Sequence, residues 1–317
     1  MLKRKNLFTI GCYNVENLFD IKNDPLTYDD QFTPNGKNRW NKSKYKNKLR
    51  KISTVISKIG TNSSAYPPVI MGLVEVENNR VLKDLIAHKN LREFNYNFIH
   101  YDSLDERGID VALLYNANFF EPENSKVYDI GLLNSKGEKD HTRDILLVSG
   151  RLNGELIHFI VNHWPSRREG VLETEKKRIK ASEMVLKIID QIREEHDSAK
   201  IVVMGDFNDD PVDRSIKGLL SNDNLFNPME DLYEKGLGSL KYRGKWNLFD
   251  QIIFSKSFFD SNLSEHSFVK AGVFNERWLE VHKGKLKGSP FRTYIGPWYK
   301  GGFSDHFPVY ACFENDI

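Results

Sequence analysis

A short buried strand followed by a polar turn constrains this chain more than any other stretch. Residues 201–204 are Ile-Val-Val-Met, a run too short for a helix and rich in β-branched side chains. It predicts a strand buried on both faces. Gly205 ends the strand, and Asp206 and Asn208 then emerge on the same side of the turn. Ligand sites of α/β proteins lie at strand ends, although a turn that uses Asp and Asn only for its backbone geometry is the alternative.

Similar strands recur along the chain and outnumber the helices. They are expected at residues 7–13, 69–74, 96–101, 109–115, 127–131, 145–152, 156–162, 248–254, 268–273 and 307–313. Asn153-Gly154 is a hairpin signal. Helical spacing predicts helices over residues 45–59 and 173–195, and Asn78 and Pro211 mark two shorter ones. Without a repeat or linker, the pattern predicts one domain over residues 1–317, with two packed sheets flanked by helices.

Composition narrows the classes of function. The net charge of +2 excludes a polycation that coats nucleic acid. Two cysteines cannot form a zinc cage, and Cys12 and Cys312 are expected as free thiols, although a bridge between the first and last strands stays open. No run approaches the roughly 18 apolar residues of a membrane span. The first strand follows the N-terminus too closely for a signal peptide, so a cytoplasmic protein is expected, but a trimmed export signal would look the same.

A polar residue that can bind metal or move a proton lies at or near one end of several predicted strands. These residues are Asn14, Glu75, His163, Asp206 with Asn208, Asp250, and Asp305 with His306. Their recurrence on six strands predicts a shared rim. The set is rich in oxygen ligands and has no cysteine, so it suits Mg²⁺ or Mn²⁺ rather than zinc. The histidines add proton transfer or stabilisation of negative charge.

The motifs around these residues resemble a known superfamily. They are CYNVENL, GLVEVEN, VNHWPSR, GDFND, FDQIIFS and SDHFPV. Their order from Asn14 to Val309 is that of the endonuclease/exonuclease/phosphatase superfamily with the DNase-I-like fold, and the chain is most similar to bacterial members that open with NVENLFD. The resemblance implies an α/β four-layer sandwich, in which two packed mixed β-sheets are flanked by helices.

The resemblance also implies a role for each residue around the metal. Glu75 would be the main ligand of Mg²⁺, with Mn²⁺ or Ca²⁺ as substitutes. Asn14 would hold a metal-bound water or a phosphate oxygen, and Asp305 would add to the metal or water shell. Asp206 would orient or deprotonate the attacking water, and Asn208 would hold the scissile phosphate.

Two histidines would complete the chemistry. His306, oriented by Asp250, would stabilise the negative charge of the transition state. His163 resembles the acid that protonates the leaving oxygen in the deoxyribonuclease-like branch, with Asp110 as its expected partner. The sequence NHWPSR departs from the abasic-site repair branch, which uses an aspartate or tyrosine there.

Other candidates would contact the substrate. Arg143 resembles a phosphate-contacting arginine of the deoxyribonuclease branch. Arg107, Arg167 and Arg168 are weaker candidates, for which a surface role is an equal alternative. Glu77 is expected either in the metal shell or as a helix cap. The lysine-rich face of the first helix is solvated or contacts a polyanion, and the aromatic residues at 278–303 either stack on a base or pack over the sheet.

These observations favour a Mg²⁺-dependent phosphodiesterase that acts by in-line attack of water. A DNA endonuclease of low sequence specificity, monomeric and without a membrane anchor, is the leading hypothesis. The alternative is the same chemistry on a small phosphoester, such as an inositol phosphate, a nucleotide or a lipid headgroup. An inactive binding module is the third hypothesis, and it predicts damaged site residues, which the sequence does not show.

Overall fold

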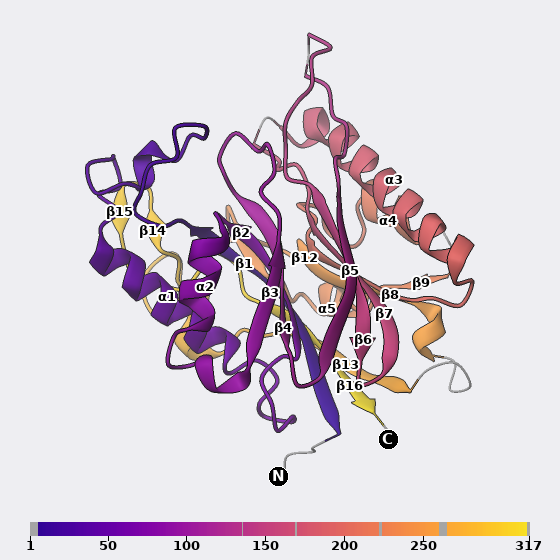
Figure 1. Cartoon of the computed structure of the whole chain (residues 1–317). Coiled ribbons are helices and arrows are strands. Elements are labelled where there is room, and N and C mark those ends of the chain that lie inside the picture. The colour runs from indigo at the N-terminus through magenta and orange to yellow at the C-terminus, as the bar shows by residue number, and fades with distance from the viewer. Residues whose placement is uncertain (1–5, 135, 169, 222–223, 260–264, 316–317) are drawn as a thin grey trace.

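Two six-stranded sheets form the centre of the protein (Figure 1). The computed structural model describes residues 6–134, 136–168, 170–221, 224–259 and 265–315. The first sheet has the order β13 (His266–Val273), β16 (Val309–Asn315), β1 (Leu7–Leu18), β2 (Ile70–Val76), β4 (Asp110–Asn116) and β3 (Tyr96–His100). The second has the order β5 (Phe120–Tyr128), β6 (Ile145–Leu152), β7 (Glu155–His163), β8 (Lys200–Asp206), β12 (Asp250–Ser255) and β9 (Leu225–Phe226). Each sheet has one parallel pair, β1 with β2 and β7 with β8, so both are mixed.

Helices cover the outer face of each sheet. In Figure 1, α1 (Lys42–Ile56) and α2 (Asn79–Ile86) lie outside the first sheet. On the opposite side, α3 (Val171–Glu195) covers the second sheet through an apolar face, and α4 (Arg214–Leu220) packs against α3. The four layers confirm the predicted sandwich. None of the described helices is long and apolar enough to cross a membrane.

Shorter elements lie in the connections. They are α5 (Met229–Glu234), the strand pairs β10 (Leu240–Tyr242) with β11 (Lys245–Asn247) and β14 (Tyr294–Ile295) with β15 (Trp298–Tyr299), and the 3-10 helices η1 (Asp30–Phe32), η2 (Arg92–Phe94), η3 (Lys256–Phe259) and η4 (Arg277–Leu279).

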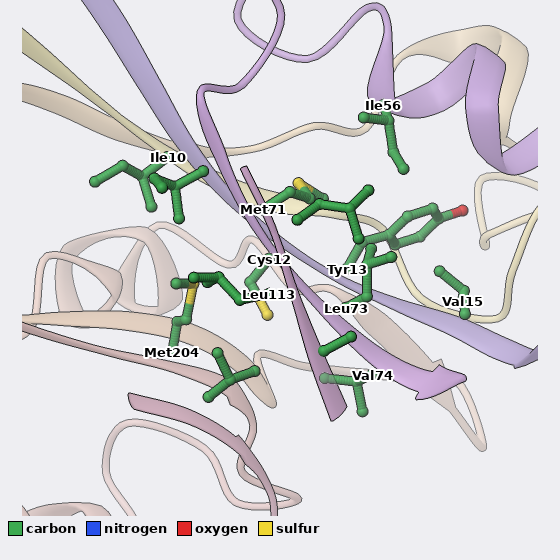
Figure 2. Packing of buried hydrophobic residues seen from close by; sticks show 14 of the residues in the cluster. Ile10, Cys12, Tyr13, Val15, Ile56, Met71, Leu73, Val74, Leu113 and Met204 are labelled. Atoms are coloured by element: carbon green, nitrogen blue, oxygen red, sulfur yellow. The ribbon is translucent and has the colours of Figure 1, made fainter. Parts of the chain in front are cut away.

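The main core lies between the two sheets. Figure 2 shows Cys12 of the first sheet in the same cluster as Met204 of the second. The sheets lie close together at Gly72, because a Cβ atom there would lie 2.9 Å from the sulfur of Met204. A larger residue at this position would therefore require the Met204 side chain to move.

Several predicted boundaries differ from the structure, and two of the differences have a clear physical reason. The strand expected at residues 127–131 runs instead over Phe120–Tyr128. It is an edge strand with alternating exposed side chains and a register shift at Pro122, so it lacks the apolar run that marks buried strands. The helix expected at Pro211 begins at Arg214, because residues 210–213 form a turn in which the amide of Asp210 donates to the Asp213 side chain.

Two other expectations are confirmed. Asn78 caps α2, because its side chain accepts from the amides of Arg80 and Val81. Both cysteines are free thiols: Cys312 lies opposite Thr9, not Cys12, in the antiparallel pair of β1 and β16.

The strand directions create a single polar edge. The ends of β7 and β8 and the start of β12 meet there, so that His163, Asp206 and Asp250 are successive neighbours across three strands. In the first sheet, the polar part of β1 runs beside β2 towards the same edge. This explains how residues far apart in the sequence form one site.

Candidate active site

Asp206 lies at the centre of the polar edge and connects the two sheets. Its Oδ2 accepts from the Asn14 side-chain amide at 3.0 Å, and its Oδ1 accepts from the backbone amide of Asn208 at 2.9 Å. Asn14 comes from the first sheet, whereas Asp206 ends β8 in the second. Burial raises the pKa of Asp206 to about 6, with the nearby Asp250 carboxylate also raising it and His306 opposing the change. A carboxylate with a pKa near neutrality is suited to accept a proton.

The backbone around Asp206 needs special conformations. Gly205 has φ +152°, and a Cβ atom there would lie 2.0 Å from the carbonyl oxygen of Asn162. Asn208 has φ 51°, and Glu75 has φ 67° at a register shift in β2. Non-glycine residues with positive φ are uncommon and cluster at functional sites. The backbone at Glu75 and Asn208 thus adopts conformations that cost free energy, and these conformations set the direction of the two polar side chains.

Asp250 and His306 form a buried pair beside Asp206. Nδ1 of His306 lies 2.6 Å from Oδ2 of Asp250, and the second oxygen of Asp250 has no hydrogen-bond partner in the described part of the chain. Burial by itself lowers the pKa of His306, but Asp250 and Asp206 outweigh it and raise that pKa well above the usual value. His306 is therefore a cation at neutral pH.

His163 is in the opposite state. Burial, together with Arg143 and Arg107, lowers its pKa well below the usual value, so its imidazole is neutral. Its Nε2 lies 3.9 Å from Oδ2 of Asp206, and its Nδ1 has no hydrogen-bond partner among the residues described.

The predicted pairing of His163 with Asp110 is not present in the structure. Asp110 instead lies with Oδ2 3.5 Å from Nε2 of His100, and its Oδ1 accepts from the amide of Ser103 at 3.1 Å. A strand alternates its faces at every residue, so a one-residue error in alignment directs a side chain to the wrong side. The sequence placed Asp110 on the correct strand but did not determine its face.

Glu75 and Asp305 supply the carboxylates from the first sheet and the segment before β16. Glu75 accepts from the amide of Asn17 at 2.9 Å, and its other oxygen lies 3.5 Å from Arg107. Asp305 accepts from Arg292 at 2.8 Å. Burial raises the pKa of Asp305, but His306 and Arg292 outweigh it and hold that pKa below its usual value. The side chains of Glu75, Asp305 and Asn14 offer oxygen donors of the kind that Mg²⁺ or Mn²⁺ prefers.

A buried network beside these carboxylates was not predicted. Glu16 accepts from the amide of Thr293 at 2.6 Å and lies 3.8 Å from Nζ of Lys48 and 3.5 Å from Nε of Arg292. Lys48 also donates to the Thr293 hydroxyl at 2.6 Å and to the Phe303 carbonyl at 2.8 Å. Arg292 thus bridges Glu16 and Asp305, and the network fixes the segment that carries Asp305.

The expectation that the lysines of α1 form a solvated or polyanion-binding face is wrong for Lys48. Its side chain is 1% exposed. The signal was present in the sequence, because residue 48 follows Tyr45 by three positions and precedes Ile52 by four, on the inner face of the helix. Two other lysines of the helix, Lys44 and Lys51, lie over the rings of Tyr299 and Phe303.

The four arginine candidates differ in what they contact. Arg167 donates to the Asn208 carbonyl, to Asp209 and to Asp213, and its guanidinium lies over the ring of Phe249. These contacts leave it little capacity for a substrate, so its position supports a structural role.

The remaining three arginines lie nearer the mouth of the site. Arg143 is buried and donates to Asp105 and to the Trp164 carbonyl, but its Nε has no partner among the described residues. Arg107 donates to the Asn17 side chain at 2.6 Å. Arg168 is exposed and, within the described residues, has no hydrogen-bond or ion-pair partner.

Two pockets are lined by residues that contact the candidate site, namely Arg292, which donates to Asp305, and Arg143, which donates to the Trp164 carbonyl. One, of about 550 Å³, is lined by Trp40, Tyr294, Glu16 and Arg292 among others. The second, of about 220 Å³, is lined partly by Arg107, Arg143, Arg168 and Lys177. The aromatic residues at 278–303 have different surroundings. Trp278 packs on Phe303, whereas Tyr294 lines the larger pocket.

Glu77 does not cap the following helix. Its side chain accepts from the amide of Asp20 at 2.5 Å, and burial together with Asp20 raises its pKa to about 8. Asn78 supplies the cap instead.

Solved structures of low sequence identity share the fold. An endonuclease/exonuclease/phosphatase family protein from Bacteroides thetaiotaomicron superposes with a TM-score of 0.61 at 16% identity, covering 99% of this chain and 100% of that chain. A mannosyl-6-phosphatase from the same organism gives 0.59 at 17% identity, covering 96% and 99%. D. rerio TDP2 in complex with a single-strand DNA product gives 0.60 at 13% identity, covering 98% and 100%.

Sequence comparison identifies the family. No protein in the curated set matches the chain significantly. A family model, however, matches residues 9–315, which include every residue of the polar edge described above. The chain therefore belongs to the Endonuclease/Exonuclease/phosphatase family, whose members hydrolyse phosphoester bonds.

Proposed function

We propose that this chain is a Mg²⁺-dependent phosphodiesterase that hydrolyses DNA with little sequence preference. The main support is the buried Asp206, which has a pKa of about 6. It lies near His306, whose pKa is raised well above the usual value by Asp250 and Asp206 despite burial. One group can accept a proton while the other stabilises negative charge, and this division of roles is what in-line attack of water on a phosphodiester requires.

The side chains around Asp206 suit each part of this reaction. Asp206 accepts the proton of the attacking water, while its hydrogen bonds from Asn14 and Asn208 fix the orientation of the carboxylate. His306, oriented by Asp250, stabilises charge on the phosphoryl oxygens. Mg²⁺ held by Glu75 and Asp305 would neutralise the phosphate and help to position it.

His163 needs the substrate to act as the predicted acid. In the free protein it is neutral and a poor proton donor. A bound phosphodiester brings negative charge next to the imidazole and raises its pKa. We therefore assign protonation of the leaving oxygen to His163 in the complex, without help from Asp110.

The substrate assignment rests on the basic side of the site. Arg107, Arg143 and Arg168 line one pocket beside His163, and the free guanidinium of Arg168 is available for a phosphate next to the scissile one. A polynucleotide supplies such a neighbouring phosphate. The D. rerio TDP2 neighbour, bound to a single-strand DNA product, adds a precedent on the same fold.

A small phosphoester is the second candidate. The larger pocket beside Arg292 has the volume of a small-molecule site and an aromatic wall from Trp40 and Tyr294. It would accept one nucleotide or one sugar ring without a polymer. The mannosyl-6-phosphatase neighbour is the corresponding precedent.

Nicking of supercoiled plasmid separates these proposals. We expect Mg²⁺-dependent nicking by the parent protein and none by Asp206→Asn. Hydrolysis of bis-p-nitrophenyl phosphate without nicking would keep the chemistry and transfer the substrate to the small-phosphoester class. Inactivity on both substrates, with Mg²⁺ and Mn²⁺, would contradict the proposed function.

A further inference from the structure

A second cluster of metal-binding side chains lies outside the set assigned to catalysis. His100 ends β3, Asp110 begins β4, and Asp102 lies in the loop between these strands. One ligand atom from each can be chosen so that all three lie within 4.8 Å of one another. Nδ1 of His100 is 3.9 Å from Asp102, and Nε2 is 3.5 Å from Asp110.

His100 has unusual surroundings for a histidine with only a structural role. Its side chain is 0% exposed, and within the described residues neither ring nitrogen has a hydrogen-bond partner. Leaving one buried polar group unpaired costs about 1–3 kcal/mol, and such groups in native proteins call for an explanation, for example an ion. A cation bound to one ring nitrogen would supply the partner which that nitrogen lacks.

The surface next to the cluster is acidic. Asp102 is 73% exposed and borders a pocket of about 400 Å³ that Asp20, Asp24 and Glu77 also line. This charge attracts cations to the entrance of the cluster, and the exposed Asp102 is free to move towards a bound ion.

We propose that His100, Asp102 and Asp110 bind one divalent transition-metal cation of the Zn²⁺ class. One imidazole with two carboxylates is a mixed nitrogen and oxygen set, which favours Zn²⁺ or Co²⁺ over Mg²⁺. Ligand atoms in an occupied zinc site are about 3.3 Å apart, so the three ligand atoms would have to draw closer around a cation, and the exposed Asp102 has room to move. Water completes the coordination.

The cation would act as a clamp on the loop between β3 and β4. Two ligands lie at its start and one at its end. The loop carries Asp105, which accepts from Arg143, and Arg107, which lies 3.5 Å from Glu75. Closing the ends of the loop therefore holds two contacts of the candidate active site in place.

Cobalt spectroscopy tests the site without relying on activity. The Glu75→Gln protein, which lacks the proposed catalytic ligand, is freed of metal, saturated with Mg²⁺ and titrated with Co²⁺. We expect visible Co²⁺ absorption that saturates at one ion per chain. Asp102→Asn in the same background should weaken Co²⁺ binding at least about tenfold, and His100→Gln should abolish the absorption. Asp24→Asn, an exposed acid of the same pocket outside the cluster, is the matched control and should change it little.

The outcomes are distinct. A Co²⁺ signal that persists unchanged in Asp102→Asn, or no signal in the Glu75→Gln parent, would overturn the proposal and leave His100 as an imidazole between two carboxylates. Because Asp102 is exposed, the Asp102→Asn result does not depend on refolding a buried position. Plasmid nicking plays no part in this test, so failure of the proposed function would leave it intact.

Discussion

Asp206 shows how a residue can be destabilising and yet suited to chemistry. Its raised pKa means that the folded protein prefers the protonated form. For a carboxyl of this kind, stability is highest at low pH and falls as pH rises from about 4 to about 6. At neutral pH the ionised Asp206 therefore reduces the free energy of unfolding in the metal-free protein.

The first prediction follows from this destabilising effect of the ionised Asp206. Asp206→Asn should abolish hydrolysis, yet at pH 8 without metal it should be at least as stable as the parent, with a gain of up to about 3 kcal/mol. Urea unfolding at pH 8 and pH 4 measures the difference, which should shrink at pH 4. A large loss of stability at both values would indicate a structural role instead.

The Asp250 and His306 pair gives the second prediction. His306 has a raised pKa, so its contribution to stability is complete below about pH 6.5 and is lost as pH rises through the raised value. Asp250→Asn removes the carboxylate that keeps His306 charged. Its activity relative to the parent should therefore decline further between pH 6 and pH 9. A deficit that is the same at every pH would argue against charge stabilisation by His306.

The connection between β7 and α3 contains two adjacent arginines, Arg167 and Arg168, with different surroundings. Arg167 is held by several acceptors, whereas Arg168 has none among the described residues. Arg168→Ala should raise KM for DNA severalfold, leave stability unchanged and weaken the salt dependence of binding. Arg167→Ala should destabilise the protein by about 2–4 kcal/mol, because it leaves Asp209 with fewer partners. Equal effects of the two substitutions would contradict this assignment.

Helix α1 supports the active site through one buried lysine. Lys48→Met removes one of the two cations beside Glu16, leaving Arg292, and also removes the donor to the Thr293 hydroxyl, at a cost of about 1–3 kcal/mol. The segment carrying Asp305 should then be less well held, which would raise the Mg²⁺ concentration needed for half-maximal activity. Lys46→Met, an exposed lysine on the same helix, is the control. A Lys48→Met protein with parental stability and metal dependence would exclude this support.

For the whole molecule, the topology predicts a single cooperative unit. The first strand, β1, pairs with β16 near the C-terminus on one side and with β2 on the other. Neither half of the chain can complete the first sheet alone, and the main core is shared by both sheets. We propose that residues 1–317 form one domain. Calorimetry should show one transition with an enthalpy of about 200 kcal/mol, and two separated transitions would contradict it.

Buried strands and their polar ends were readable from the sequence because they follow local rules. An apolar β-branched run predicts a buried strand, and Asp206, Glu75 and His163 each lie at the end of such a run. The edge strand β5 was misplaced because its exposed side chains give no apolar run. Its position depends on pairing with β6, which is a tertiary contact.

The class of fold and the residue types at the polar edge could be predicted from the sequence, since both depend on local periodicity and on the motifs. The contacts between side chains could not, because they form only when distant segments meet in the folded protein. Asp110 faces His100 rather than His163, Arg167 is tied to Asp209, and Lys48 is buried beside Glu16. Partner choice depends on strand register and on the approach of distant segments. A shift of one residue reverses a side chain without changing the local pattern.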